Sequence, residues 1–519
     1  MSRYLLAFLA AACLFAAPTP NCQSLQSLQI PGLFILTAES ISAGTQLRPQ
    51  QITLPAHCLL HGEVNKHTGR DGKPYGDIFE LRLPADWNGR FLFQGGGGLD
   101  GILQPAIGPG GLGERAALLR GYAVVSTDGG HSADPASHGL DGAFGSDPAA
   151  LADYQYRSTQ LVADAAQKII SHYYGHPPKH SYFRGCSNGG REGLIAAQRY
   201  PRYFDGVIAG APAFHLTRAM IAEAWNTMQF AAVSPQNLPA AAFSESDLQL
   251  IAHAVLAQCD SLDGFKDDLI FNPAACHYDP AGLQCPSEKA PTCLSSEQVT
   301  AIKKIMSGPI DSHGNALYSD WPYDSGIEAP DWRFWLLGNE KMPALNVLIF
   351  PPAVNGMALA GKQPPIDIFH FNFDTGSTRI NRAAAALNPD STNYTAFRAH
   401  GGKLILWAGM SDPIFSANDL IHYYQDITRA NGGPAQTLNF ARLFLLPGVT
   451  HCGGGPGLDS FDSLTALEAW VEDGTAPEHI IARGNAFPGR TRPLCPYPLT
   501  PHYNGTGNPE NAAAFFCAK

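Results

Sequence analysis

The sequence predicts a mixed α/β fold built on a mostly parallel sheet. Two blocks of the chain alternate short apolar strands with helices, which is the pattern of parallel strands joined by crossover helices. The first block ends near residue 213 and the second begins near residue 401. Strands are expected at 121–128, 182–183, 204–212, 402–409 and 441–447, and helices at 153–170, 191–198, 416–424 and 463–472.

The irregular stretch between the two blocks, residues 214–400, is expected to be an inserted lid domain. It holds four cysteines, several tryptophans and proline-rich segments. The α/β domain then comprises residues 21–213 and 401–519, because the sheet resumes after the insertion. Before the first block, short strands are expected at 33–36, 51–54 and 77–83.

The composition is that of a loop-rich globular protein. Hydrophobic residues make up 45% of the 519 residues and charged residues only 15%, while glycine (53) and proline (41) are abundant. The formal net charge is -11, and no run of Lys and Arg offsets it. This balance argues against nucleic acid as a partner, because phosphate backbones bind to basic surfaces.

The N-terminus has the pattern of a secretory signal. Arg3 precedes an apolar run at residues 5–17, which is too short for a stable membrane span. We expect residues 1–20 to direct export to the periplasm or the exterior; a buried N-terminal helix is the alternative. Cys13 lacks the leucine three positions earlier that a lipoprotein signal carries, which argues against a lipid anchor there. No other apolar run is long enough to span a bilayer.

Eleven cysteines are present, and Cys13 lies in the expected signal. The remaining ten are an even number, which in an exported chain indicates disulfides, although spacing alone leaves their connectivity open. Three pairs lie close enough in sequence to suggest local bridges: Cys259 and Cys276, Cys285 and Cys293, Cys495 and Cys517. There is no CxxC pair, which argues against structural zinc.

Residues 181–194 carry the central motif. Tyr182 and Phe183 favour a strand, Gly-Cys-Ser-Asn-Gly follows at 185–189, and a helix-compatible run comes next. G-x-S-x-G between a strand and a helix exposes a nucleophilic serine, because the glycines remove side chains that would clash. The helix N-terminus directs N–H groups toward developing negative charge. Ser187 is therefore the candidate nucleophile, and a glycine-rich turn with an incidental serine is the alternative.

A run of four glycines at 95–98 directly follows the apolar strand expected at 91–93. An early loop of this kind lets a backbone N–H approach a substrate oxyanion. A flexible turn is the alternative. A phosphate cradle is disfavoured, because no GK[ST] follows the glycines.

A serine hydroxyl needs a histidine to remove its proton and a carboxylate to orient that histidine. In α/β-hydrolases these residues occur in the order Ser, Asp or Glu, His. Ser187, Asp412 and His451 occur in this order, each at the C-terminal end of an expected strand. Asp419 is the nearest rival acid but falls within the next expected helix. A structural histidine is the alternative reading of His451.

Two cysteines flank these candidates. Cys186 precedes Ser187 and Cys452 follows His451. If the serine and the histidine lie within hydrogen-bond reach, a disulfide between their neighbours would join the two active-site loops. A catalytic cysteine is disfavoured, because Cys186 should point away from the site when Ser187 points into it.

An acidic loop lies within the lid at 259–270. Three carboxylates and two intervening carbonyl groups supply oxygen atoms of the kind that calcium prefers: Asp260, Asp263, Phe265, Asp267 and Leu269. The D-x-[DN]-x-[DN]-G pattern of an EF-hand is missing. A solvated acidic turn explains the same residues equally well.

The chain resembles the tannase and feruloyl esterase family, which includes fungal feruloyl esterases, tannases and a bacterial mono-(2-hydroxyethyl) terephthalate hydrolase (MHETase). The resemblance rests on Gly-Cys-Ser-Asn-Gly-Gly-Arg at 185–191, Ser-Asp-Pro at 411–413 and Thr-His-Cys-Gly-Gly-Gly-Pro-Gly at 450–457. It covers nearly the whole chain after the signal and implies an α/β-hydrolase fold with a large inserted lid domain. Many relatives carry histidine where this chain has Ala408.

The resemblance also implies roles for particular residues. Ser187, Asp412 and His451 would form the triad, and the N–H groups of Asn188 and Gly97, chosen over Gly96, would form the oxyanion hole. The acidic loop of the lid would hold a structural calcium ion. The implied disulfides are Cys186–Cys452, Cys22–Cys58, Cys259–Cys276, Cys285–Cys293 and Cys495–Cys517.

The expected function is that of a secreted serine esterase that cleaves feruloyl, galloyl or terephthaloyl esters. MHETase-like activity, a catalytically silent surface-binding protein and acyl transfer to an acceptor other than water are the alternatives. Ile414, Phe415 and Trp335 are the candidate substrate contacts. We expect a small aromatic ester as partner, no organic cofactor, and a monomer or weak homo-oligomer.

Overall fold

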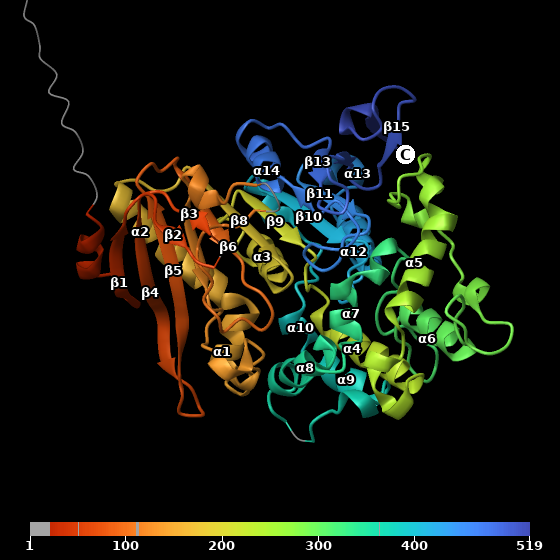
Figure 1. The fold of residues 1–519 in the computed structure, drawn as a ribbon. Helices are drawn as coiled ribbons and strands as arrows, with labels where there is room; N and C mark the ends of the chain where they lie inside the picture. The colour runs from red at the N-terminus through yellow and green to blue at the C-terminus, as the bar shows by residue number, and fades with distance from the viewer. Residues whose placement is uncertain (1–20, 50, 111–113, 363) are drawn as a thin grey trace, which may run out of the picture.

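The structure is a computed structural model that describes residues 21–49, 51–110, 114–362 and 364–519. The expected signal at 1–20, with Cys13, lies outside the described residues. A nine-stranded sheet crosses the molecule (Figure 1). Its strands, in spatial order, are β1 (Leu33–Ile41), β4 (His57–Thr68), β5 (Pro74–Pro84), β7 (Ala123–Thr127), β6 (Arg90–Gln94), β8 (His180–Cys186), β9 (Gly206–Gly210), β10 (Lys403–Gly409) and β11 (Ala441–Leu446).

The sheet has a parallel part and an antiparallel part. The six strands from β7 to β11 are parallel neighbours, whereas β1, β4 and β5 pair antiparallel at the N-terminal edge. The expected α/β class with a mostly parallel sheet is therefore confirmed. Parallel strands place their carboxyl ends at the same edge, and the loops there carry the candidate site.

Helices cover both faces of the sheet, and side chains along each strand alternate between these faces. Phe91 and Phe93 of β6 face a core formed with α2 (Ser158–Tyr174), α3 (Asn188–Arg199) and α12 (Ala417–Ala430). Leu92 faces the opposite core with α14 (Ser463–Glu472). Both layers consist of buried side chains, which hold the helices against the sheet.

The N-terminal strands differ from expectation in two places. The strand expected at 51–54 is only β3 (Ile52–Thr53), which pairs with β2 (Gln46–Leu47) outside the main sheet. The long strand β4 was not expected. Its buried positions alternate as Cys58, Leu60, Gly62 and Val64, a period-2 pattern that glycine and cysteine weaken.

The chain between β9 and β10 contributes no strand to the main sheet within its described residues. Val207 of β9 pairs directly with Leu404 of β10, so the two strands on either side of the insertion are neighbours in the sheet. The apolar side chains of the insertion form a core that it shares with residues of the rest of the chain, among them Phe144, Tyr154 and Phe415. Its helices are α4 (Leu216–Ala232), α5 (Glu245–Cys259), α6 (Ser296–Ser307), α7 (Pro330–Leu336), α8 (Leu345–Phe350), α9 (Thr375–Asn381), α10 (Ala384–Leu387) and α11 (Thr395–Ala399).

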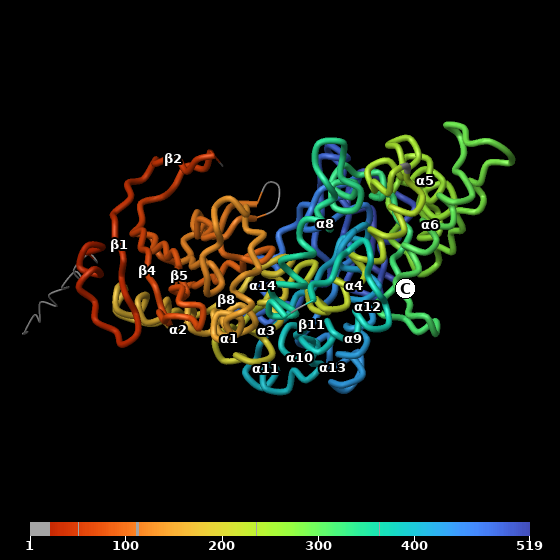
Figure 2. The backbone as a smooth tube through the Cα atoms, turned by 90° about the horizontal axis from the view of Figure 1, so that it is seen from below, coloured from red at the N-terminus to blue at the C-terminus, as the bar shows by residue number. Residues whose placement is uncertain are grey.

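Seen from below, β1 and β4 lie at one end of the molecule and α5 and α6 at the other (Figure 2). The remaining elements are α1 (Pro148–Ala152) and α13 (Pro434–Thr437), a small sheet of β12 (Ser460–Phe461), β13 (Ile480–Arg483) and β14 (Arg492–Leu494), and the pair β15 (Thr500–Tyr503) and β16 (Phe515–Ala518). No helix in the described part of the chain is long and apolar enough to cross a membrane.

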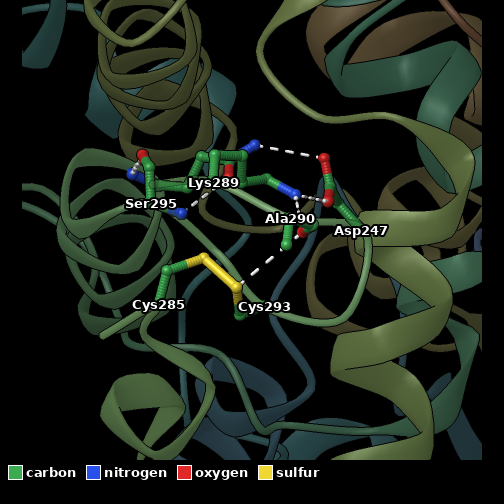
Figure 3. Close-up of a disulfide and its surroundings, with 7 residues drawn as sticks. Asp247, Cys285, Lys289, Ala290, Cys293 and Ser295 are labelled. Carbon is green, nitrogen blue, oxygen red and sulfur yellow. Dashed lines mark hydrogen bonds and ion pairs between the residues drawn. A yellow bond between two sulfur atoms is a disulfide. The ribbon is translucent and has the colours of Figure 1, made fainter. Parts of the chain in front are cut away.

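Ten cysteines form five disulfides, in the pairs that the family resemblance implies: Cys22–Cys58, Cys186–Cys452, Cys259–Cys276, Cys285–Cys293 and Cys495–Cys517. Figure 3 shows one of the local bridges, which closes a loop of the insertion. Lys289 in this loop forms a 2.7 Å ion pair with Asp247 in the first turn of α5. The bridge and the ion pair together fix the loop against the helix.

Candidate active site

Ser187 is the single residue between the end of β8 and the start of α3. Its φ of 62° lies in the left-handed region, where a residue with a side chain is strained. The turn is tight because glycines approach one another: a Cβ on Gly185 would lie 2.4 Å from the carbonyl carbon of Gly189, and one on Gly189 would lie 2.6 Å from the carbonyl oxygen of Gly96. The strained turn directs the hydroxyl toward the adjacent cavity.

Asp412 and His451 lie on the loops after β10 and β11. Nδ1 of His451 is 2.8 Å from Oδ2 of Asp412. The other oxygen, Oδ1, accepts the backbone N–H groups of Ile414 and Phe415 at 2.9 and 3.0 Å. Both carboxylate oxygens are thus engaged and the carboxyl is buried. The carboxylate favours a proton on Nδ1, which leaves Nε2 as an acceptor.

Asp419, the rival acid, lies elsewhere. It sits in α12 and contacts Nδ1 of His215 at 2.9 Å. The geometry therefore brings Asp412, and not Asp419, to His451.

The Cys186–Cys452 disulfide joins the serine loop to the histidine loop, with a Cα–Cα distance of 6.0 Å. Ser187 and His451 line the same cavity. Within the described residues no hydrogen bond joins them, and Sγ of Cys452 lies 3.7 Å from Nε2 of His451. In enzymes without substrate such a serine–histidine contact is often long and tightens on binding.

The glycine run forms a loop over the start of α3. Gly96 donates its N–H to Oε2 of Glu192 at 3.0 Å, so this group is occupied. Gly97 and Asn188 line the cavity, and in the described chain neither donates its backbone N–H to a protein acceptor. These two N–H groups are free to bind an anionic oxygen, which is what an oxyanion hole requires.

A buried polar network supports this loop, and sequence reasoning missed it. The side-chain amide of Asn188 donates to Asp100 and, at 3.2 Å, to Glu192. The hydroxyl of Tyr154 donates to the carbonyl of Gly98 at 3.1 Å. Burial and the neighbouring Glu192 raise the pKa of Asp100, and burial raises that of Glu192. The positions of Asp100 and Glu192 beside the two glycine motifs are the only sequence signal for their role.

The cavity has a volume of about 640 Å³ and runs between the sheet edge and the insertion. The three candidate substrate contacts line it: Ile414, Phe415 and Trp335. The rings of Trp335 and Phe415 each lie 5.5 Å from the imidazole of His451, centroid to centroid. Trp332, by contrast, packs against Phe230 in the core of the insertion. The walls are mostly apolar and suit an aromatic group.

The acidic loop of the insertion holds its carboxylates close together. Asp260 accepts the N–H groups of Asp267 and Asp268, and Asp263 accepts those of Phe265 and Phe271. Burial, together with the charges of Asp267 and Asp260, raises the pKa of Asp263 to about 7.

Arg492 neutralises part of this charge, because its guanidinium pairs with Oδ2 of Asp267. The other oxygen of Asp267 is buried without a hydrogen-bond partner. The loop thus has more carboxylate groups than the single arginine can neutralise, and carboxylate oxygens are ligands that suit a hard cation. Among the described residues, however, no three His, Cys, Asp or Glu side chains converge as metal ligands.

Residues 63–518 match the family model described as tannase and feruloyl esterase. The chain is 41% identical to the mono(2-hydroxyethyl) terephthalate hydrolase of Piscinibacter sakaiensis over 522 residues, which cover 90% of this chain and 85% of that relative. It is 32% identical to a probable feruloyl esterase of Arthroderma benhamiae over 550 residues, which cover 99% and 96% of the two chains.

Solved structures share the fold. Feruloyl esterase B from Aspergillus oryzae matches with a TM-score of 0.81 and 24% identity, covering 96% of this chain and 99% of that one. The tannin acyl hydrolase from Aspergillus niger matches with a TM-score of 0.72 and 22% identity, covering 94% and 92%.

Proposed function

This chain belongs to the tannase and feruloyl esterase family and is a carboxylic ester hydrolase, and we propose that it cleaves esters of aromatic acids with a triad of Ser187, Asp412 and His451. The observation that carries the proposal is the 2.8 Å contact between Asp412 and His451 on the cavity that Ser187 also lines. This contact joins the proposed base, His451, to the buried carboxylate of Asp412, on the same cavity as the strained Ser187.

In the proposed reaction, Nε2 of His451 takes the proton of Ser187 as its Oγ attacks the ester carbonyl. Asp412 holds the imidazole by its Nδ1 and stabilises the positive charge that forms. The N–H groups of Asn188 and Gly97 stabilise the negative oxygen of the tetrahedral intermediate. His451 then returns the proton to the leaving alcohol, and an acyl group remains on Ser187.

A water molecule completes the cycle. His451 removes a proton from the water, which attacks the acyl carbonyl, and the same proton returns to Oγ of Ser187 as the acid leaves. The aromatic ring of the acid would lie against Trp335, Phe415 and Ile414, because these side chains form apolar walls beside His451. Mono-(2-hydroxyethyl) terephthalate is the second candidate substrate, since the 41% identical relative is named for its hydrolysis.

The direct test replaces Ser187 with alanine and follows hydrolysis of feruloyl, galloyl and terephthaloyl esters. We expect kcat to fall by at least about 10⁴-fold while the thermal midpoint changes little, because the nucleophile is lost and packing is not. A fluorophosphonate should label the wild-type chain at Ser187. Undiminished turnover in the variant would refute the triad, and an unlabelled, inactive wild type would favour a silent binding protein. Added alcohols would reveal acyl transfer.

Residues 214–400 would act as the lid over this cavity, and residues 21–213 with 401–519 would form the catalytic domain. Five disulfides fit an extracellular protein. We further infer export through a signal in residues 1–20, without a lipid on Cys13. The mass of the mature secreted chain tests both inferences.

The acidic loop is proposed to hold a structural calcium ion. The carboxylates of Asp260, Asp263 and Asp267 and the carbonyls of Phe265 and Leu269 would supply its ligands; the ion would add stability and take no part in the chemistry. We expect a chelator to lower the thermal midpoint and calcium to restore it, since a ligand that binds only the folded state stabilises it. Asp263→Asn should abolish this response. A thermal midpoint that changes with neither the chelator nor added calcium would contradict the proposed calcium site.

A further inference from the structure

Glu223 is a buried acid in the wall of the active-site cavity. It lies on α4 and lines the cavity together with Leu216 and Met220. The three residues are spaced i, i+4 and i+7, which places them on one face of the helix. Glu223 is only 6% exposed, and its Oε2 is buried without a hydrogen-bond partner.

The surroundings of Glu223 are apolar. Among the described residues, it is the only ionisable side chain that the insertion contributes to the cavity wall. The neighbouring wall residues from the insertion are Leu345, Ile349, Ala353 and Trp335. Because no described protein group forms a hydrogen bond with Oε2 of this acid, a polar group on a bound ligand could do so.

Among the described residues that line the cavity, no unpaired cation is present to balance a negative charge. Arg184 is the only Lys or Arg among its described lining residues, and it pairs with Glu114 at 3.0 Å. The imidazole of His451 is engaged with Asp412. Burial raises the pKa of Glu223 to about 8, so at neutral pH the group is mostly a neutral acid that can both donate and accept a hydrogen bond.

Glu223 lies two turns into α4, whose first residue follows shortly after a contact with Ser187. The N–H of Ala213, at the approach to this helix, donates to the carbonyl of Ser187 at 3.1 Å. Leu216 opens α4, and Glu223 follows about 10 Å further along at the usual rise per residue. A group held there would be at the distal end of a substrate whose carbonyl sits at Ser187.

We propose that Glu223 binds the distal substituent of the aromatic acid, and that the site therefore prefers acids with an uncharged hydrogen-bonding group, such as a phenolic hydroxyl, over acids with a second carboxylate. This proposal rests on the proposed esterase function. A hydroxyl satisfies the buried acid without bringing in charge. A carboxylate would be buried beside an acidic group with no cation to balance it.

The experiment compares three methyl esters that differ only in the distal position: 4-hydroxycinnamate, cinnamate and 4-carboxycinnamate. At pH 7 we expect the wild type to hydrolyse the hydroxyl ester with a kcat/KM at least about tenfold above that of the unsubstituted ester. The carboxylate ester should be the poorest of the three. A common alcohol ensures that only the acid side is varied.

Two variants separate hydrogen bonding from packing. Glu223→Leu should bring the ratio between hydroxyl and unsubstituted esters close to one, because no polar partner remains. Glu223→Gln should keep most of the preference, since the amide both donates and accepts. Ratios cancel differences in the amount of active enzyme. Glu328→Gln, a lid carboxyl outside the cavity lining, is the matched control and should leave the ratio unchanged.

The proposal is overturned if Glu223→Leu retains the tenfold preference, or if the wild type hydrolyses the carboxylate ester as fast as the hydroxyl ester. Failure of the underlying esterase function looks different. In that case the wild type hydrolyses none of the three esters and a fluorophosphonate does not label Ser187, which removes both proposals together.

Discussion

Asn188 serves the candidate site in two ways. The residue lines the cavity, where its backbone N–H is proposed to bind the oxyanion, and its side chain donates to Asp100 and Glu192. Glu192 in turn accepts the N–H of Gly96. The two halves of the proposed oxyanion hole are thus linked through one buried acid pair, with Glu192 as a positioning residue.

Replacing Glu192 with alanine should release Gly96 and loosen the loop that carries Gly97. We expect kcat to fall by about tenfold or more with little change in KM, because oxyanion donors act mainly in the transition state. Steady-state kinetics with one good ester would measure this split. Glu192→Gln keeps an acceptor for Gly96 and should recover most of the rate. An alanine variant with wild-type kcat would show that the loop carrying Gly97 keeps its position without Glu192.

At the scale of elements, the site depends on loops from separate strands of one sheet. Ser187 follows β8, Asp412 follows β10, and His451 follows β11. The sheet register positions the strand ends, whereas the disulfide Cys186–Cys452 joins the loops themselves across a sequence separation of 266 residues.

Removal of this bridge by the double change Cys186→Ala and Cys452→Ala should lower kcat/KM by about tenfold or more, because the distance between Ser187 and His451 is no longer fixed. Stability should also fall, by roughly 5 kcal/mol, because the bridge closes so long a loop. Kinetics and thermal unfolding measure the two effects. In the wild type, mild reduction should weaken activity before the protein unfolds.

Cys285 and Cys293 provide the control, since their bridge closes a loop with a separation of only 8 residues in the insertion (Figure 3). Their replacement by alanine should lower stability less and leave kcat/KM unchanged. Equal activity losses in the two double variants would argue that any lost disulfide disturbs the fold, and that Cys186–Cys452 has no special role.

Across the whole molecule, buried carboxyl groups make stability depend on pH. Burial raises the pKa of Asp153 to about 8 and that of Asp77 to about 6, and the charge of Asp77 adds to the effect on Asp153. Burial also raises the pKa of Glu223 to about 8. The folded state therefore binds more protons than the unfolded state between about pH 4 and pH 8.

Stability should decrease as pH rises through this window, by about 1.4 kcal/mol per pH unit for each extra proton bound by the folded state. Below the unfolded pKa both states are protonated and the stabilising contribution is complete; it is lost as pH rises through the folded pKa. Chemical denaturation from pH 5 to pH 8 measures the slope. Asp153→Asn should flatten it, and an unchanged slope in that variant would exclude Asp153 as a source.

Local patterns of the sequence determine the α/β class, the serine turn, the order of the three candidate catalytic residues and the acidic loop. They do so because glycine spacing, strand periodicity and residue order are properties of short segments. The family motifs also imply the cysteine pairs that the structure forms. The triad and the calcium ion stay predictions that the experiments above address.

Only the tertiary structure decides which distant groups meet. Asp412 rather than Asp419 contacts His451, Glu192 occupies the N–H of Gly96, and Glu223 faces the active-site cavity. None of these contacts has a local signal, since each joins elements that are distant in sequence or depends on burial. An acid on a helix is usually solvated; Glu223 becomes unusual only because folding places it in an apolar wall without a partner.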